Sequence, residues 1–151
     1  MSKCIFLTSD CPLENYSPSK EYPIEINVDT GEIFDGGADD NFFLNSFKDT
    51  QSYSDKKFGV CLEWNYTDGR AKNLIEYIKI VLKNADSVEL WNVWLDFYYE
   101  YDESPVIHNK TVSVSDLSVN VIRNFVSSDN FNMPDIRNPE RPSFYRLTIT
   151  Q

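Results

Sequence analysis

The sequence predicts an α+β domain in which a mostly antiparallel sheet is packed by two helices. Three observations support this fold class: short aromatic and β-branched runs with period-two alternation, two stretches with helical periodicity, and the order in which they occur. That order is strands, helix, paired strands, helix and a final strand, which is typical of α+β domains. At 151 residues the chain can bury one substantial core, so residues 1–151 are predicted to form a single domain.

The predicted strands are apolar, β-branched or aromatic runs bounded by turn residues. They comprise residues 4–8, 24–28, 58–65, 88–98, 106–114 and 144–150. The run 24–28 alternates between apolar and polar residues, as a half-buried strand should. In the turn that follows, the Asp29 side chain can cap the backbone and Gly31 can supply a positive φ. Turn residues between 88–98 and 106–114 predict that these two strands form a hairpin.

The two predicted helices each carry an apolar stripe at helical spacing. The first covers residues 71–83, and its stripe consists of Leu74, Ile78, Val81 and Leu82. The second, shorter helix covers residues 115–127, and its stripe consists of Leu117, Val121, Ile122 and Phe125. Residues 42–47 are apolar and fit either a short strand or a helical turn.

The charge balance favours a cationic partner. The chain has 24 acidic against 14 basic residues, a formal charge of −10 and a pI of about 4.5. Direct nucleic-acid binding is disfavoured, because neutralising phosphates requires clustered cations, and an anionic membrane surface is disfavoured for the same reason. The plainer interpretation is that the charge only keeps the protein soluble. The sequence contains no signal peptide and no run that could span a bilayer, which predicts a cytoplasmic protein.

A recognition surface is predicted on the long strand at residues 88–98. Its side chains alternate, so one face is apolar and is expected to lie under a helix; it carries Trp91, Val93, Leu95 and Phe97. The other face interleaves aromatic and polar groups, starting at Asn92, and suits protein contacts. The alternative is a solvated sheet face. The candidate partner-binding residues are Trp94, Asp96, Tyr98 and Glu100, with Asp102, Asp39 and Asp40 as rim charges.

No catalytic or metal-binding signature stands out. His108 is the only histidine, and no nucleophile motif accompanies it, so a structural or surface role is expected. Cys4 and Cys61 are expected to be reduced core residues. The acidic loop at residues 35–41 lacks the ligand spacing of a calcium site and is expected to be an exposed, flexible loop. No cofactor is predicted. An enzyme that uses carboxylate pairs is the weakest alternative, with candidates Glu63, Asp96 and Glu100.

Four segments and one helix together resemble small acidic immunity proteins of bacterial polymorphic toxin systems. The segments are residues 5–13 (IFLTSDCPL), 42–46 (FFLNS), 58–62 (FGVCL) and 88–94 (VELWNVW), and the helix covers residues 74–82. The resemblance implies a non-enzymatic inhibitor that binds a cognate toxin domain and blocks it. Many such toxins are nucleases with cationic grooves, which an acidic, aromatic surface could fill. The alternative is a small acidic adaptor or a homodimer formed through the aromatic strand.

Overall fold

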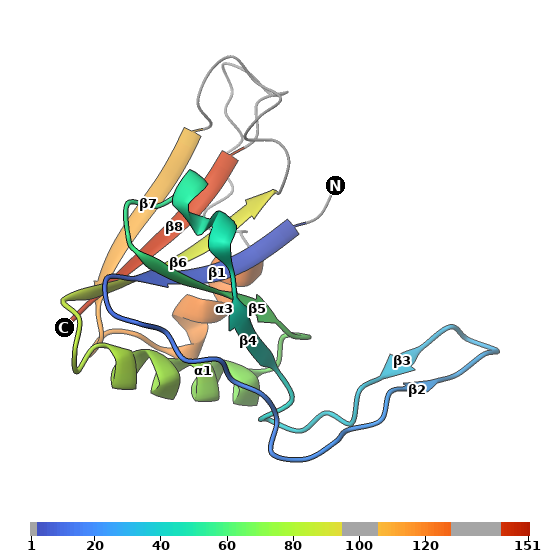
Figure 1. The fold of residues 1–151 in the computed structure, drawn as a ribbon. Helices are drawn as coiled ribbons and strands as arrows, with labels where there is room; N and C mark the ends of the chain where they lie inside the picture. The colour runs from blue at the N-terminus through green and yellow to red at the C-terminus, as the bar shows by residue number, and fades with distance from the viewer. Residues whose placement is uncertain (1–2, 95–105, 128–142) are drawn as a thin grey trace.

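The structure is a computed structural model of the 151-residue chain and describes residues 3–94, 106–127 and 143–151. A six-stranded sheet has the order β4-β5-β1-β6-β8-β7 and is antiparallel except for the β7–β8 pair. Its strands are β1 (Lys3–Ser9), β4 (Phe43–Ser46), β5 (Phe58–Glu63), β6 (Ser87–Trp94), β7 (Val106–Ser113) and β8 (Ser143–Thr150). With the helices α1 (Asp68–Val81) and α3 (Val119–Ser127), this arrangement confirms the predicted α+β class (Figure 1).

The main core lies between one face of the sheet and the two α-helices. Leu74 and Ile78 of α1 and Ile122 of α3 are fully buried against sheet residues such as Leu90 and Leu147. These helix residues belong to the apolar stripes that the sequence predicts. Full burial of each such side chain contributes roughly 1.5–3 kcal/mol, which explains why both helices dock here. None of the helices formed by the described residues has the length and apolar character needed to cross a bilayer.

A second, smaller cluster covers the other face of the sheet. Phe6, Trp91 and Phe144 are buried there, and Tyr53 packs against them just after the 3₁₀ helix η1 (Lys48–Ser52). The prediction that a helix covers the Trp91 face is therefore wrong. The helices cover the opposite face of β6, where Asn92 is 1% exposed and its Nδ2 donates to the Phe125 carbonyl at 3.2 Å.

The strands β6 and β7 do not form the predicted hairpin. β8 lies between them, pairing antiparallel with β6 and parallel with β7. β6 and β8 bury Leu90 and Leu147 side by side, so β8 completes the core next to β6. The turn residues in the sequence favour direct pairing of β6 with the next strand, β7. In the structure, β8 occupies the place beside β6 instead.

The strands β2 (Glu25–Ile26) and β3 (Ile33–Phe34) form a separate two-stranded hairpin that projects away from the sheet and helices (Figure 1). We call residues 24–34 the arm. The prediction of a half-buried strand at 24–28 is wrong, because Ile24, Ile26 and Val28 are 66%, 61% and 89% exposed.

Candidate functional site

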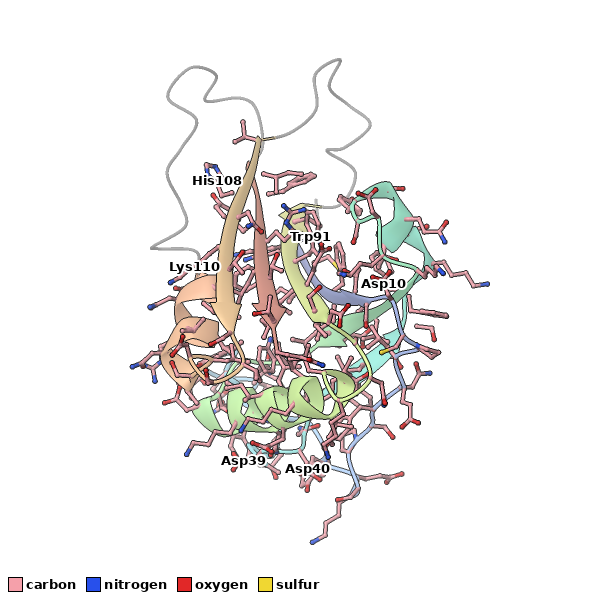
Figure 2. The ribbon with its side chains drawn as sticks, turned by 90° about the vertical axis from the view of Figure 1, so that its left-hand side faces the viewer. Asp10, Asp39, Asp40, Trp91, His108 and Lys110 are labelled. Carbon is pink, nitrogen blue, oxygen red and sulfur yellow. The ribbon has the colours of Figure 1, made fainter. Side chains whose placement is uncertain are left out.

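Most of the predicted partner-binding residues lie outside the described part of the chain. This applies to Asp96, Tyr98, Glu100 and Asp102. The backbone of Trp94 ends β6 and pairs with Lys3. The structure does not bring Asp39 and Asp40 near that strand end, because they lie beside α1, well apart from Trp91 of β6 (Figure 2). The predicted rim charges and the predicted aromatic strand therefore do not form one continuous surface among the described residues.

Asp40 is a structural anchor. Its carboxylate accepts hydrogen bonds from the Tyr22 hydroxyl at 2.7 Å and from the Ser19 hydroxyl at 2.7 Å. These bonds stabilise the charged form and lower the pKa of Asp40. Asp39 is exposed, its backbone carbonyl accepts from Asn73 of α1 at 2.8 Å, and its carboxylate lies against the start of α1. Of the predicted rim charges that the structure describes, Asp39 is thus the more exposed residue, although its carboxylate lies close to Gly69.

A buried arginine anchors the segment that leads out of the arm. Arg70, in the first turn of α1, is 0% exposed, and its guanidinium makes a bidentate ion pair with Asp35 at 2.9 and 3.0 Å. Asn65 Nδ2 and the Gly37 amide also donate to this carboxylate. The Arg70 guanidinium holds the pKa of Asp35 well below its usual range. The expectation that this loop is flexible and exposed is wrong at Asp35. Its carboxylate accepts hydrogen bonds from Arg70, Asn65 and Gly37.

The lowered pKa of Asp35 makes part of the stability depend on pH. A carboxylate whose folded pKa lies below its unfolded value of about 3.9 stabilises the fold fully above that value, and the contribution is lost as pH falls towards the folded pKa. We therefore expect the free energy of unfolding to fall more steeply below about pH 5 in the wild type than in Asp35→Asn. Urea titrations between pH 7 and pH 3 measure this, and parallel curves for the two proteins would contradict it.

A groove of about 680 Å³ lies where the arm joins the body. Its walls combine aromatic and apolar side chains with carboxylates. They include Tyr22, Ile24, Asp35, Phe43, Glu63 and Trp64. Phe43 is 40% exposed, while Trp64 is half-buried and packs edge-on against the buried Phe42 ring, with centroids 6.2 Å apart. The groove is thus an aromatic hollow whose charged lining consists of three carboxylates and one lysine, Lys20, and Ile24 joins it to the arm.

The arm exposes apolar side chains that a monomer normally buries. Ile26 pairs with Ile33 across the hairpin, so both point to the same face, and the exposed Ile24 lies just before β2. Ile33 is 66% exposed, and Phe34, on the other face, is 57% exposed. Single exposed apolar residues are ordinary, but a contiguous exposed apolar row marks an interaction surface.

Acidic residues surround this apolar row. Residues 21–47 contain seven acidic residues and no lysine or arginine. Three of the acids, Glu25, Asp29 and Glu32, are exposed on the arm itself. This signal was available in the sequence but is dispersed over a long segment, whereas the aromatic run at 91–101 is compact. The arm therefore combines apolar contact area with a negative rim, the combination that the sequence pattern predicts for the 88–98 strand.

Two other polar side chains, Glu89 and His108, make contacts within the fold. Glu89 Oε2 accepts from Ser54 Oγ at 2.6 Å, from Trp91 Nε1 at 2.9 Å and from Thr8 Oγ1 at 3.0 Å, which ties the second sheet face together. His108 stacks on Tyr145 with ring centroids 5.3 Å apart. Among the described residues, no three histidine, cysteine or carboxylate side chains gather as a metal site would require.

The thiols of Cys4 and Cys61 lie 3.4 Å apart on the adjacent strands β1 and β5. Cys61 is directly opposite Phe6, so the two cysteines occupy diagonal positions of the ladder. Both are free thiols. The hydrogen bond between them and the burial of Cys4 raise the pKa of the Cys4 thiol, which favours its protonated form. These thiols therefore form part of the packing of the second sheet face, as core cysteines commonly do.

Comparison with known proteins gives no family. No protein family, no curated protein and no solved structure matches the chain. The function is therefore argued from the arm, the groove and the charge distribution.

Proposed function

We propose that this chain is a cytoplasmic, non-enzymatic immunity protein that binds a cognate bacterial toxin domain and blocks it. The observation that carries the proposal is the projecting arm, where a contiguous apolar row is exposed within a strongly acidic segment. Exposed apolar area supplies affinity when a partner buries it, and surrounding carboxylates accelerate the encounter with a cationic protein. The resemblance of the sequence segments to immunity proteins supports a toxin as the partner.

The charge supports a cationic toxin groove as the surface that is blocked. A net charge of −10 attracts a cationic protein over a range set by the ionic strength, about 8 Å at physiological salt. A nuclease is one toxin class with such a groove. We propose that the inhibitor competes with the anionic substrate for this groove, so that no chemical step by this chain is required.

Co-expression tests the proposal in cells. The adjacent gene is expressed in a bacterial host with and without this chain, and growth is recorded. We expect the neighbour to arrest growth alone and to be harmless when this chain is present. Arrest that persists despite well-expressed chain, or a neighbour that is harmless alone, would contradict the proposal. With purified proteins, the association rate should fall as salt is raised.

A small acidic adaptor or homodimer is the second candidate. The same exposed isoleucines would favour it, since two copies could bury them against each other. The charge opposes self-association, because each copy brings the same acidic segment to the contact. Light scattering decides this point: a stable dimer would favour the second candidate over the first.

A further inference from the structure

We propose that the arm is the docking element, and that it inserts its isoleucine face into an apolar groove rimmed by lysine or arginine on the partner protein. This inference rests on the proposed protein-binding function and names the surface and the chemistry that carry it. The surface is residues 24–34, where the paired Ile26 and Ile33 share one face, the exposed Ile24 lies just before β2 and Val28 lies in the turn at the tip. It differs from the 88–98 strand that sequence patterning favours.

Local hydrogen bonds to Asn27 shape the turn at the tip of the arm. The Asn27 side chain accepts hydrogen bonds from the amides of Asp29 at 3.0 Å and Thr30 at 3.2 Å. The Gly31 amide donates to the Asn27 carbonyl at 2.7 Å, with Gly31 at φ +73°. The cap comes from Asn27 where the sequence suggested Asp29, while the positive φ at Gly31 is confirmed. A preformed tip loses less conformational entropy on binding.

The chain is anchored on both sides of the arm, just before residue 24 and just after residue 34. On the side that enters the arm, the Tyr22 hydroxyl donates to Asp40. On the side that leaves it, Asp35 is bound by the buried Arg70. Two strands of two residues each are marginally stable without such support. These anchors hold an apolar hairpin away from the body, where it makes no core of its own.

The charge around the arm selects the occupant. A second copy of this chain would bring the same acids to the contact, including Glu25 and Glu32. Nucleic acid and anionic membranes are repelled by the same charges. A protein groove with an apolar floor and a cationic rim matches both the isoleucines and the carboxylates.

Substitutions in the arm test the inference cleanly, because the side chains are exposed and support no core packing. Ile26→Asp and Ile33→Asp place a charge on the apolar face. The matched control is Ile80→Asp on the outer face of α1, because Ile80 and Ile26 are both 61% exposed. The probe is the purified product of the adjacent gene, and the readout is its dissociation constant. We expect each arm variant to weaken binding roughly 30-fold or more, and the control to bind as the wild type does.

The outcomes separate the inference from the proposed function. If the wild type binds and the arm variants bind equally well, the arm is not the docking element, although the function stands. If the wild type does not bind this probe, the proposed function fails. Crosslinking in the native cells then tests whether the arm is the docking element. A photo-crosslinking residue at position 26 should then yield one protein adduct that is lost with Ile33→Asp and is absent from position 80. No adduct, the same adducts from both positions, or an adduct with a second copy would overturn the inference.

Discussion

Replacing Arg70 with methionine is expected to lower the free energy of unfolding by about 3–5 kcal/mol, because the change leaves the Asp35 carboxylate without its buried partner. Arg70 is fully buried and also donates to the backbone carbonyls of Ala38 at 3.1 Å and Asn65 at 2.8 Å. Methionine matches much of the arginine volume but donates no hydrogen bond. Urea unfolding followed by circular dichroism at pH 7 measures the loss.

The matched control for Arg70 is Arg123→Met. Arg123 pairs with Asp68 at 2.7 Å, but the two side chains are 48% and 56% exposed. Such an exposed pair contributes little to stability, because water screens its charges. Equal losses in the two variants would show that burial of Arg70 does not decide its contribution. If the arm depends on this anchor, proteolysis within residues 24–34 should also become faster in Arg70→Met than in Arg123→Met.

Replacing Trp91 with alanine is expected to cost about 3–5 kcal/mol of stability, because it empties the centre of the second sheet face. The indole is 0% exposed and lies parallel to Phe6, with ring centroids 6.0 Å apart. The Arg146 guanidinium stacks over it at 5.3 Å from the ring centroid. Circular dichroism is the suitable probe of unfolding, since the variant also removes a fluorophore.

Two further variants show which property of Trp91 matters. Trp91→Phe keeps an aromatic ring but removes the N–H that donates to Glu89, so an intermediate loss of about 1–3 kcal/mol is expected. Trp64→Ala removes an indole that is only half-buried, and a smaller loss than for Trp91→Ala is expected. A Trp91→Ala protein as stable as the wild type would contradict the described packing of this face.

The strength of the sequence patterns explains which elements could be predicted. The helix stripe containing Leu74 and Ile78 is long and regular, and both residues are buried as expected. Alternation at residues 24–28 correctly indicated two unlike faces, but a pattern does not reveal whether anything covers the apolar one. The same limit applies to β6. Alternation places Trp91 and Asn92 on opposite faces, but it does not tell on which face the helices pack.

Contacts distant in sequence explain the remaining errors. An arginine in the first turn of a helix resembles a solvated charge, and its partner Asp35 precedes it by 35 positions. The pairing of β8 between β6 and β7 is likewise non-local, so turn residues near the end of β6 could not predict it. The acidic composition favours a cationic partner, and that partner stays a prediction. Asp40, one of the predicted binding residues, is likewise held by residues distant in sequence, because its carboxylate accepts hydrogen bonds from Tyr22 and Ser19.

Hydrogen–deuterium exchange of the chain, alone and in complex with the product of the adjacent gene, tests protein binding through the arm most directly. Residues 24–34 make only a few backbone hydrogen bonds of their own, so their amides should exchange quickly in the isolated chain. In the complex, their exchange is expected to slow by about tenfold or more, with Ile80 and its neighbours on α1 unchanged. A complex in which the arm exchanges as fast as before, while another surface becomes protected, would contradict docking through the arm.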